Sequence, residues 1–203
     1  MLLKEVHHRV KNNLQLVSSL LALHSRSISA PDLRRRFGEV QGQIGAIAAT
    51  YDVLQQMKNV DVVDFSHVVP TLCQNIQVSN GESVAISTET GSDALVSADT
   101  AVALALALNE LITNSIKHAT GDQNVAIAVS CQRDGERVLI RIADNGPGFP
   151  PDFDLDQAEG FGMRMARTMV KQAGGQIRLA GSQSGAIVEI FAPVAVRSRQ
   201  KTP

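Results

Sequence analysis

The chain has 203 residues, of which 44% are hydrophobic and only 3% aromatic, with no Trp. It is long enough for one large domain or two small ones, and its core has to be built from Ala, Val, Leu and Ile. A formal net charge of −1 excludes the overall positive field that gathers nucleic acid or acidic membrane, so we expect neither as a partner.

Cysteine use and hydropathy indicate the compartment. Cys73 and Cys131 stand far apart, without the spacing of a metal site, which favours a reduced, cytoplasmic setting. The most apolar window, residues 101–108, is far shorter than the ~20 residues that span a bilayer, so we expect no direct membrane contact. The chain also begins abruptly inside an amphipathic pattern, and we expect it to be a piece of a longer protein.

The N-terminal quarter predicts a helical hairpin. Residues 2–28 repeat apolar side chains at steps of three and four, the pattern of an amphipathic helix. Pro31 and Asp32 follow in a turn, and a second apolar stripe predicts a helix over residues 33–57. Because a hairpin of this kind has only one face to bury, we expect residues 1–58 to pair with a second copy in a four-helix bundle, as a homodimer.

The pattern then changes to that of an α+β domain, which we place at residues 65–195. Helices are predicted over residues 66–78, 98–118 and 162–173, and strands over residues 83–88, 124–132, 137–144, 176–181 and 186–193. These elements predict a sandwich in which one mixed sheet carries helices on one face. Residues 58–65 are expected to be a link, and residues 196–203 a polar tail.

The stretch "LNELITNSIKHA" concentrates polar chemistry on an otherwise apolar helix. Glu110, Asn114 and Lys117 follow one another at i, i+4 and i+7 on one face, bordered by Asn109 and His118. The opposite face is expected to hold Leu104, Leu108, Leu111, Ile112 and Ser115. Amide and carboxylate oxygens are ligands that Mg²⁺ prefers, and a lysine can meet phosphate as a point charge. A solvated helix face is the alternative.

A second motif, "DNGPGFP", comes directly after the strand that ends at residue 144. Gly146 and Gly148 permit positive φ and a close approach of the backbone to a ligand. The carboxylate of Asp144 is an acceptor-only group, suited to an amino group such as that of adenine. An ordinary β-turn is the alternative.

A third motif, "GFGMRMA", opens the last predicted helix. Gly160 and Gly162 let backbone N–H groups at the helix start face an anion, or let the preceding loop move as a lid. By itself a single G-x-G is weak evidence for either role.

The order N-E-x-x-x-N-x-x-K-H-A, D-N-G-x-G and G-x-G-M resembles the N box and glycine boxes of the GHKL ATPases, the superfamily of gyrase, Hsp90, MutL and histidine kinases. The opening "LLKEVHHRVKNNLQLVSSLLAL" resembles the dimerisation and phosphoacceptor helix of sensor histidine kinases with an H-H-R-x-K-N-N box, which are relatives of the HWE kinases. The resemblance covers nearly the whole chain. It implies a GHKL (Bergerat) sandwich behind the hairpin, ATP and Mg²⁺ as cofactors, and the receiver domain of a response regulator as partner.

The resemblance also implies roles for single residues. Asn114 would hold Mg²⁺, with Glu110 as a possible second ligand, and Asp144 would bind adenine. Lys117 and His118 would face the phosphates. The other nucleotide-binding positions that it implies are Asn109, Asn145, Gly146, Gly148, Gly160, Gly162 and Met163.

Of the two adjacent histidines, His8 is the expected phosphoacceptor and His7 the alternative. Glu5 lies three residues before His8 and Asn12 four residues after it, on the same helical face. Glu5 can accept the second ring N–H and orient the attacking nitrogen, and Asn12 can position a water for the reverse reaction. Many histidine kinases have an acidic residue directly after the reactive histidine, whereas this chain has Arg9. The alternative is that both histidine rings are only solvated and take no part in chemistry.

Three functions compete on this evidence. The first is an active histidine kinase core, which phosphorylates itself and then a response-regulator aspartate. The second is a non-catalytic phosphotransfer or binding module with a degenerate ATP domain, against which the intact D-N-G-x-G argues. The third is a serine kinase of the anti-sigma type, which has no reason to carry a hairpin with "HHRVKNN".

The predicted lid between Gly148 and Gly160 is short and lacks a separate Phe-rich box.

Overall fold

The computed structural model describes residues 62–118, 124–158, 160–180 and 185–195, together with isolated residues between 17 and 44. The chain divides into two compact units, Met1–Lys58 and Asn59–Pro203. In the first unit, the described residues between 17 and 23 and between 33 and 44 are helical, in agreement with the two predicted helices. Several predictions fall outside the described residues: the roles of Glu5, His7, His8 and Asn12, and the tail 196–203.

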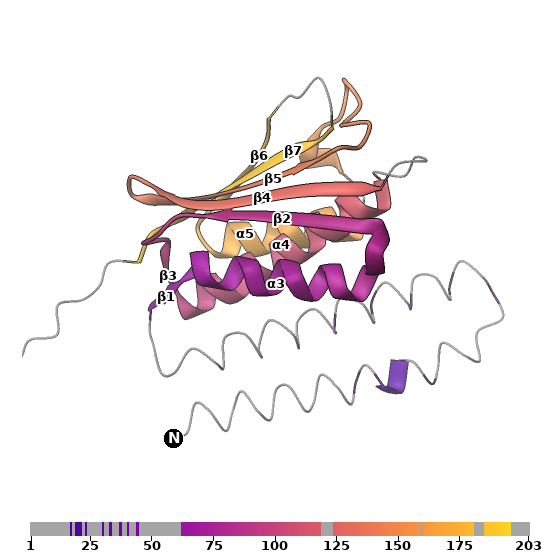
Figure 1. Cartoon of the computed structure of the whole chain (residues 1–203), viewed down its shortest axis with the longest axis horizontal. Helices are drawn as coiled ribbons and strands as arrows, with labels where there is room; N and C mark the ends of the chain where they lie inside the picture. The colour runs from indigo at the N-terminus through magenta and orange to yellow at the C-terminus, as the bar shows by residue number, and fades with distance from the viewer. Residues whose placement is uncertain are drawn as a thin grey trace, which may run out of the picture. The chain divides into compact units, whose positions relative to one another are not determined.

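A five-stranded sheet forms the centre of the second unit, in the spatial order β2-β4-β5-β7-β6 (Figure 1). Its strands are β2 (Val84–Thr90), β4 (Val125–Asp134), β5 (Arg137–Asp144), β6 (Gln176–Ala180) and β7 (Ile187–Pro193). β2 pairs with β4 in parallel, and the other three neighbouring pairs are antiparallel. The predicted mixed sheet is therefore confirmed.

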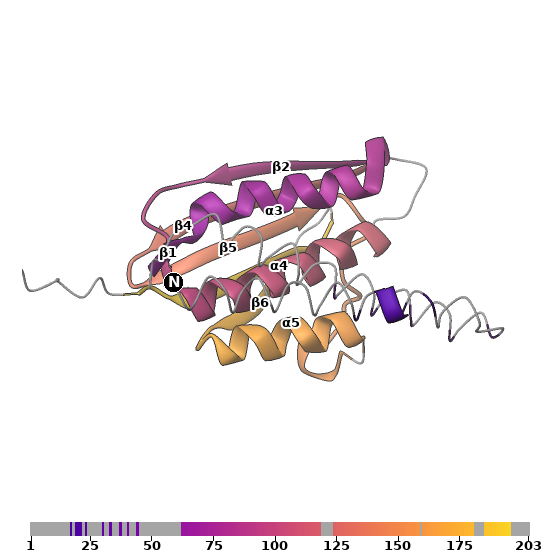
Figure 2. The same cartoon turned by 90° about the horizontal axis from the view of Figure 1, so that it is seen from below.

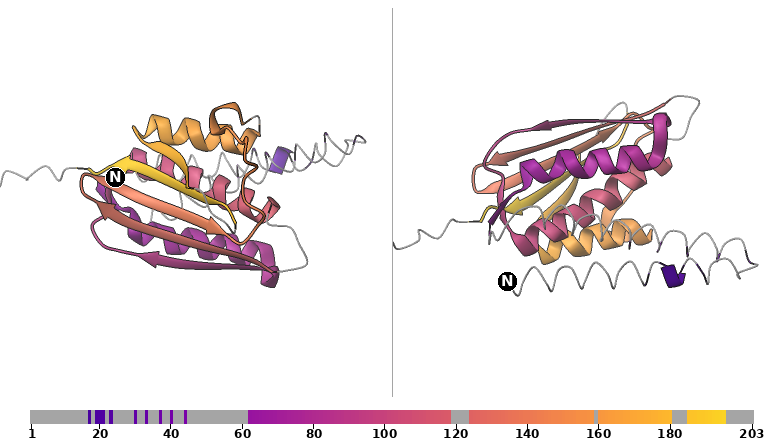
Figure 3. Two further views of the ribbon diagram at one scale, coloured as in Figure 1. Left: turned by 90° about the horizontal axis from the view of Figure 1, so that it is seen from above. Right: turned by 60° about the horizontal axis from the view of Figure 1, so that its bottom comes forward.

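Three helices cover one face of this sheet: α3 (Phe65–Asn80), α4 (Ala98–His118) and α5 (Phe161–Gln172). Figure 2 shows them side by side across that face, and Figure 3 shows the sheet in front of them from the opposite side. Strand residues alternate between the two faces, so every second one is buried against the helices. The buried residues of β4 and β5 are Ile127, Val129, Cys131, Val138, Ile140 and Ile142. The expected sandwich, with helices on one face, is confirmed.

A small second sheet was not predicted, because residues 58–65 were expected to be a link. β1 (Val62–Asp64) pairs antiparallel with β3 (Leu95–Ser97), next to the start of α3. Asp64 caps that helix: one carboxylate oxygen accepts from the backbone N of Ser66 at 3.1 Å and from its hydroxyl at 2.6 Å. The other oxygen accepts from the backbone N of Asp93 at 3.2 Å, which ties the two short strands together. Strands of three residues are too short to produce a hydropathy period.

The helix α4 lies in the middle of the helical layer and carries the polar stretch near its C-terminal end. It starts at a cap in which the hydroxyl of Ser97 accepts from the backbone N of Thr100 at 3.1 Å. Ala and Leu dominate its first three turns and are strong helix formers, and most of them are buried. The same helix therefore anchors the core with its first half and presents functional groups with its second.

Both cysteines are buried and free of disulfides. Burial raises the pKa of the Cys73 thiol to about 12. Burial likewise raises the pKa of Cys131 to about 12, with a smaller contribution from the negative charge of Asp64. The raised pKa keeps both thiols protonated at neutral pH, which makes them poor nucleophiles in this fold.

Candidate functional site: a cavity between α4, the end of β5 and the start of α5

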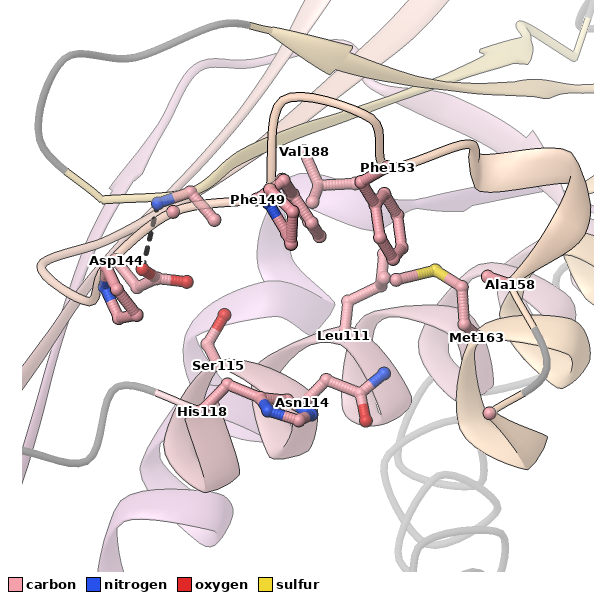
Figure 4. A pocket seen from close by; sticks show the side chains of 15 residues that line it. Leu111, Asn114, Ser115, His118, Asp144, Phe149, Phe153, Ala158, Met163 and Val188 are labelled. Carbon is pink, nitrogen blue, oxygen red and sulfur yellow. Dashed lines mark hydrogen bonds between the residues drawn. The ribbon is translucent and has the colours of Figure 1, made fainter.

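A cavity of about 520 Å³ lies where the second half of α4 meets the end of β5, the loop after it, and the start of α5 (Figure 4). Its volume is within the range of small-molecule sites. The residues that line it are Leu111, Asn114, Ser115, His118, Asp144, Pro147, Gly148, Phe149, Pro150, Phe153, Ala158, Gly160, Met163, Ala186 and Val188. They come from all three of the motifs that the sequence singles out, from the segment between the second and third motifs, and from the start of β7 with the residue before it.

Asp144 is held at one end of the cavity by its own backbone surroundings. Its Oδ1 accepts from the backbone N of Gly146 and from the backbone N of Ala186, each at 3.0 Å. Its second carboxylate oxygen accepts no hydrogen bond from a described residue and points into the cavity (Figure 4). The carboxylate is thus fixed through one oxygen and offers the other as an acceptor to a ligand.

Two glycines allow the backbone to close tightly around Asp144. Gly185 has a φ of 87°, and a Cβ there would overlap the carbonyl oxygen of Asp144. Gly148 has a φ of 78°, and its Cβ would stand 2.9 Å from the carbonyl oxygen of Gly185. Both positions require glycine for conformation and for space. Gly148 was predicted as a shaping residue, whereas Gly185 was missed because it lies in an unremarkable hairpin turn.

The faces of α4 differ from the prediction. Leu111 and Ser115 were expected opposite Asn114, yet all three line the cavity together with His118. Positions 111, 114, 115 and 118 follow one another at i, i+3, i+4 and i+7, which is one stripe of a helix. The prediction centred the polar, functional face of α4 on Glu110. The boundary between that face and the core face was therefore placed one residue too early.

Glu110 and its neighbours lie beside the cavity and do not line it. Glu110 is only 7% exposed, which excludes a solvated helix face at that position. Asn109 is half-buried and Lys117 exposed, and neither belongs to the cavity wall. The side-chain amide of Asn114 does belong to it, and it forms no hydrogen bond with a described residue, so it remains available to a ligand.

Asn145 has a structural partner in place of the predicted contact with nucleotide. Its Oδ1 accepts from the backbone N of Ala126 at 2.9 Å, and its Nδ2 donates to the carbonyl of Asn124 at 3.1 Å. These bonds fasten the loop after β5 to the start of β4. Gly146 acts in a similar way, by donating its backbone N–H to Asp144. We therefore assign both residues to holding the loop that carries Asp144.

The segment between Gly148 and Gly160 forms the outer wall. The rings of Phe149 and Phe153 stack with their centroids 4.7 Å apart, and both line the cavity. A 3₁₀ turn, η2 (Leu155–Gln157), follows, and Arg167 on α5 holds it through the carboxylate of Asp156 and through the carbonyl oxygen of that residue at 2.9 Å. The two phenylalanines were missed, although two of the chain's six within five residues was an available signal.

The start of α5 closes the cavity from the side. Gly160 and Met163 line it, whereas Gly162 is turned toward α4. A Cβ at Gly162 would stand 2.7 Å from Oε2 of Glu110 and 3.3 Å from Oδ1 of Asn114. Gly162 thus permits close packing of α5 against the polar stretch of α4.

A divalent cation fits the oxygen donors at this end of α4. Among the described residues, no group of three or more His, Cys, Asp or Glu side chains could hold a metal by itself. Asn114 offers a free amide oxygen on the cavity wall, and the carboxylate of Glu110 lies close behind it. Mg²⁺ typically takes one or two such protein ligands and completes its shell with water and substrate phosphates.

Two family models match the chain. Residues 5–80 match a family described as histidine kinase. Residues 99–196 match the family of histidine kinase-, DNA gyrase B-, and HSP90-like ATPases. No helix among the described residues has the length and apolar character needed to cross a membrane.

Known proteins resemble both parts at once. The sensor histidine kinase PdtaS of Mycolicibacterium smegmatis is 29% identical over 202 residues, which are 97% of this chain and 40% of that protein. The blue-light-activated histidine kinase 2 of Erythrobacter litoralis is 27% identical over 207 residues, covering 98% of this chain and 58% of the relative. This chain therefore spans only about half the length of these relatives.

Solved structures agree on the fold. The Erythrobacter litoralis EL346 blue-light activated histidine kinase superposes with a TM-score of 0.71 at 20% identity, over 94% of this chain and 59% of that one. The ATP-binding domain of PrrB from Mycobacterium tuberculosis superposes with a TM-score of 0.58 at 21% identity, over 66% of this chain and 97% of that one. The expected GHKL sandwich is confirmed.

Proposed function

We propose, from the premise that this chain carries the two domains of a histidine kinase, that it is the kinase core of a two-component signalling protein. In this proposal it uses ATP to phosphorylate His8 and passes the phosphoryl group to an aspartate in the receiver domain of a response regulator. One observation carries the nucleotide part. A single cavity joins the free carboxylate oxygen of Asp144 to the free amide of Asn114 and to His118.

The nucleotide spans this cavity in the proposal. Asp144 accepts a hydrogen bond from the amino group of adenine, because its free oxygen is an acceptor and the base edge is a donor. The apolar wall around it, including Leu111 and Val188, buries the faces of the ring. Asn114, Lys117 and His118 serve the phosphates, and Asn114, with Glu110 as a possible partner, holds Mg²⁺. When bound, that ion neutralises charge on the phosphate oxygens.

His8 is the proposed nucleophile. An unprotonated ring nitrogen of neutral imidazole carries a lone pair near physiological pH. That pair forms the new N–P bond as the bond from the γ-phosphorus to the bridging oxygen breaks, and ADP leaves with the electrons of that bond. The second ring nitrogen keeps its proton, which Glu5 accepts in a hydrogen bond in both the free and the phosphorylated state.

His8 is preferred to His7 because adjacent helix positions lie about 100° apart and cannot share one environment. Glu5 and Asn12 are on the face of His8, whereas His7 has Lys4 and Lys11 at the corresponding spacings. Asn12 is assigned to position a water for the reverse, dephosphorylating reaction.

The helical hairpin is the proposed dimerisation and docking element. Val17, Leu23 and Val40 are helical and exposed in the single chain, at 44%, 64% and 39% of their surface. Exposed apolar side chains repeated along one segment favour burial against another molecule, and a second copy completes a four-helix bundle. The helical surface near His8 is the proposed contact for the receiver domain. A cytoplasmic location is part of the same proposal.

The non-catalytic alternative finds no support in the described residues. A degenerate ATP domain would be expected to lose the acceptor at the base end or the amide at the phosphate end. Here Asp144 is held in place by two backbone N–H groups, and Asn114 is unengaged on the cavity wall.

The experiment is incubation of the chain with γ-labelled ATP and Mg²⁺, followed by a test of the label against acid and alkali. Phosphohistidine is labile in acid and stable in alkali, so we expect label that acid removes. Acid-stable, alkali-labile label would indicate a serine kinase instead. Nucleotide binding without any label would favour the non-catalytic module.

A further inference from the structure

Ser115 is the one polar group on the wall of the cavity to which the proposed function gives no task. It lies on α4 directly after Asn114, it is half-buried, and it lines the cavity. Figure 4 shows its hydroxyl pointing from the helix into the cavity, toward the end that holds Asp144.

The hydroxyl of Ser115 does not bind the carbonyl four residues back, as two other helical hydroxyls of this chain do. In this chain Ser79 donates to the carbonyl of Asn75, and Thr168 to that of Arg164, each at 2.8 Å and four residues back. Ser115 makes no such bond, nor any other side-chain hydrogen bond to a described residue. A hydroxyl that is aimed into a cavity in this way requires a partner there, either a ligand or a water.

Four backbone donors around Asp144 are already engaged. The N–H groups of Gly146 and Ala186 both go to Oδ1 of Asp144. The N–H of Asn145 goes to the carbonyl of Ala126 at 3.1 Å, and that of Asp144 itself to the carbonyl of Ala186 at 3.0 Å. At this end of the cavity, the hydroxyl of Ser115 is thus a donor that remains available beside the acceptor of Asp144.

The donor of Ser115 beside the acceptor of Asp144 complements the base-pairing edge of adenine and not that of guanine. Adenine presents its amino group, a donor, next to the ring nitrogen N1, an acceptor. Guanine presents the reverse, an acceptor oxygen next to an N–H, so its oxygen would face the carboxylate. We infer that Ser115 is a second base-reading residue: its hydroxyl donates to N1 of adenine, directly or through one water, while Asp144 accepts from the adjacent amino group. This inference rests on the proposed ATP site and adds to it the choice of base.

The test is a titration of the whole chain with ADP and with 1-deaza-ADP, in which a C–H group replaces N1. Calorimetry on the unaltered chain should show about three- to tenfold weaker binding of the analogue, the usual effect of losing one hydrogen bond. Ser115→Ala should weaken ADP by a similar factor and bind the analogue no more weakly than ADP. Ser79→Ala is the matched control, because it removes a helical hydroxyl far from the cavity wall, and it should retain the full preference for ADP.

The outcomes separate this inference from the proposed function. If the unaltered chain binds ADP and the analogue equally, N1 is not read at all; if Ser115→Ala still discriminates between them, another group reads N1. Either result overturns the inference while the ATP site stands. If the unaltered chain binds neither ADP nor ATP, both fail. The comparison of two ligands on the unaltered chain holds even if the Ser115→Ala variant folds poorly.

Discussion

Gly162 lies directly against Glu110, so that a Cβ on the glycine would stand 2.7 Å from Oε2 of the carboxylate. The contact joins the start of α5 to the polar stretch of α4, and Asn114 is the next nearest side chain, at 3.3 Å. Because the atom in the way is the far end of a flexible side chain, an added methyl displaces the carboxylate and leaves the backbone in place. Gly162 is thus a spacer between the start of α5 and the proposed Mg²⁺ ligands.

Gly162→Ala should therefore reduce function more than stability. Moving Glu110 and crowding Asn114 disturbs the groups that position the phosphates, and misplacement on the order of 1 Å can cost about a hundredfold in rate. We expect label incorporation from γ-labelled ATP to fall by about ten- to a hundredfold, with little change in Tm. Gly91→Ala is the control, since Gly91 does not line the cavity and a Cβ there would come no closer than 3.4 Å to its nearest neighbour, Cβ of Gln132. Equal activity of the two variants would contradict this role of Gly162.

Asp144→Asn should weaken ATP binding without unfolding the domain. An Asn can keep an oxygen in the place of Oδ1, where two backbone N–H groups donate to it. Its amide nitrogen then faces the cavity, so that a donor meets the amino group of adenine. Losing a charged hydrogen bond costs about 1.5–3 kcal/mol, which is about ten- to a hundredfold in affinity by calorimetry. Unchanged affinity would mean that adenine binds elsewhere.

Gly185→Ala should destabilise the ATP-binding domain strongly. Its φ of 87° is unfavourable for alanine, and the new Cβ would overlap the backbone oxygen of Asp144. Gly135→Ala is a matched control, since Gly135 has a φ of 62° but open space around it. The control variant measures the conformational cost alone, and we expect it to lower the free energy of unfolding by about 1 kcal/mol. We expect Gly185→Ala to lower the free energy of unfolding by about 3 kcal/mol or more. Denaturant titrations that gave equal losses for both would refute the close approach.

His8→Gln should abolish acid-labile labelling, whereas His7→Gln should retain it. The reason is the face that His8 shares with Glu5 and Asn12. ATP binding is to be measured in both variants, because it should be unaffected by either. Label that persists in His8→Gln and disappears in His7→Gln would reverse the assignment.

Residues 1–58 should form a helical dimer on their own. The exposed apolar side chains of the first unit, such as Leu23 and Leu33, need a second surface to bury them. Sedimentation equilibrium at several concentrations measures the mass of this segment, and residues 59–203 provide the comparison, which we expect to be monomeric. A folded monomer of residues 1–58 across the whole range would exclude the bundle.

The amino-acid sequence by itself determined the three helices and five strands of the main layers, though not the short strands β1 and β3, and it marked the polar chemistry that these elements carry. Period-two alternation over the central strands and the long apolar stripe of residues 98–118 predicted β4, β5 and α4 nearly to the residue. These are local patterns, in which each residue's burial depends on its own helix or strand. The three polar motifs were found for the same reason, since unusual residue types stand close together in the chain.

Only the tertiary structure decided what meets at the cavity. Gly185 and Ala186 reach Asp144 next to the pairing of β5 with β7, more than 40 residues along the chain, and no local pattern marks such a contact. The side of α4 that faces the cavity was likewise mistaken, because amphipathicity separates buried from exposed positions but cannot separate the core from a cavity wall, both of which are apolar. Ser115 therefore passed for a core position until the packing of α4 against the end of β5 placed its hydroxyl in the cavity.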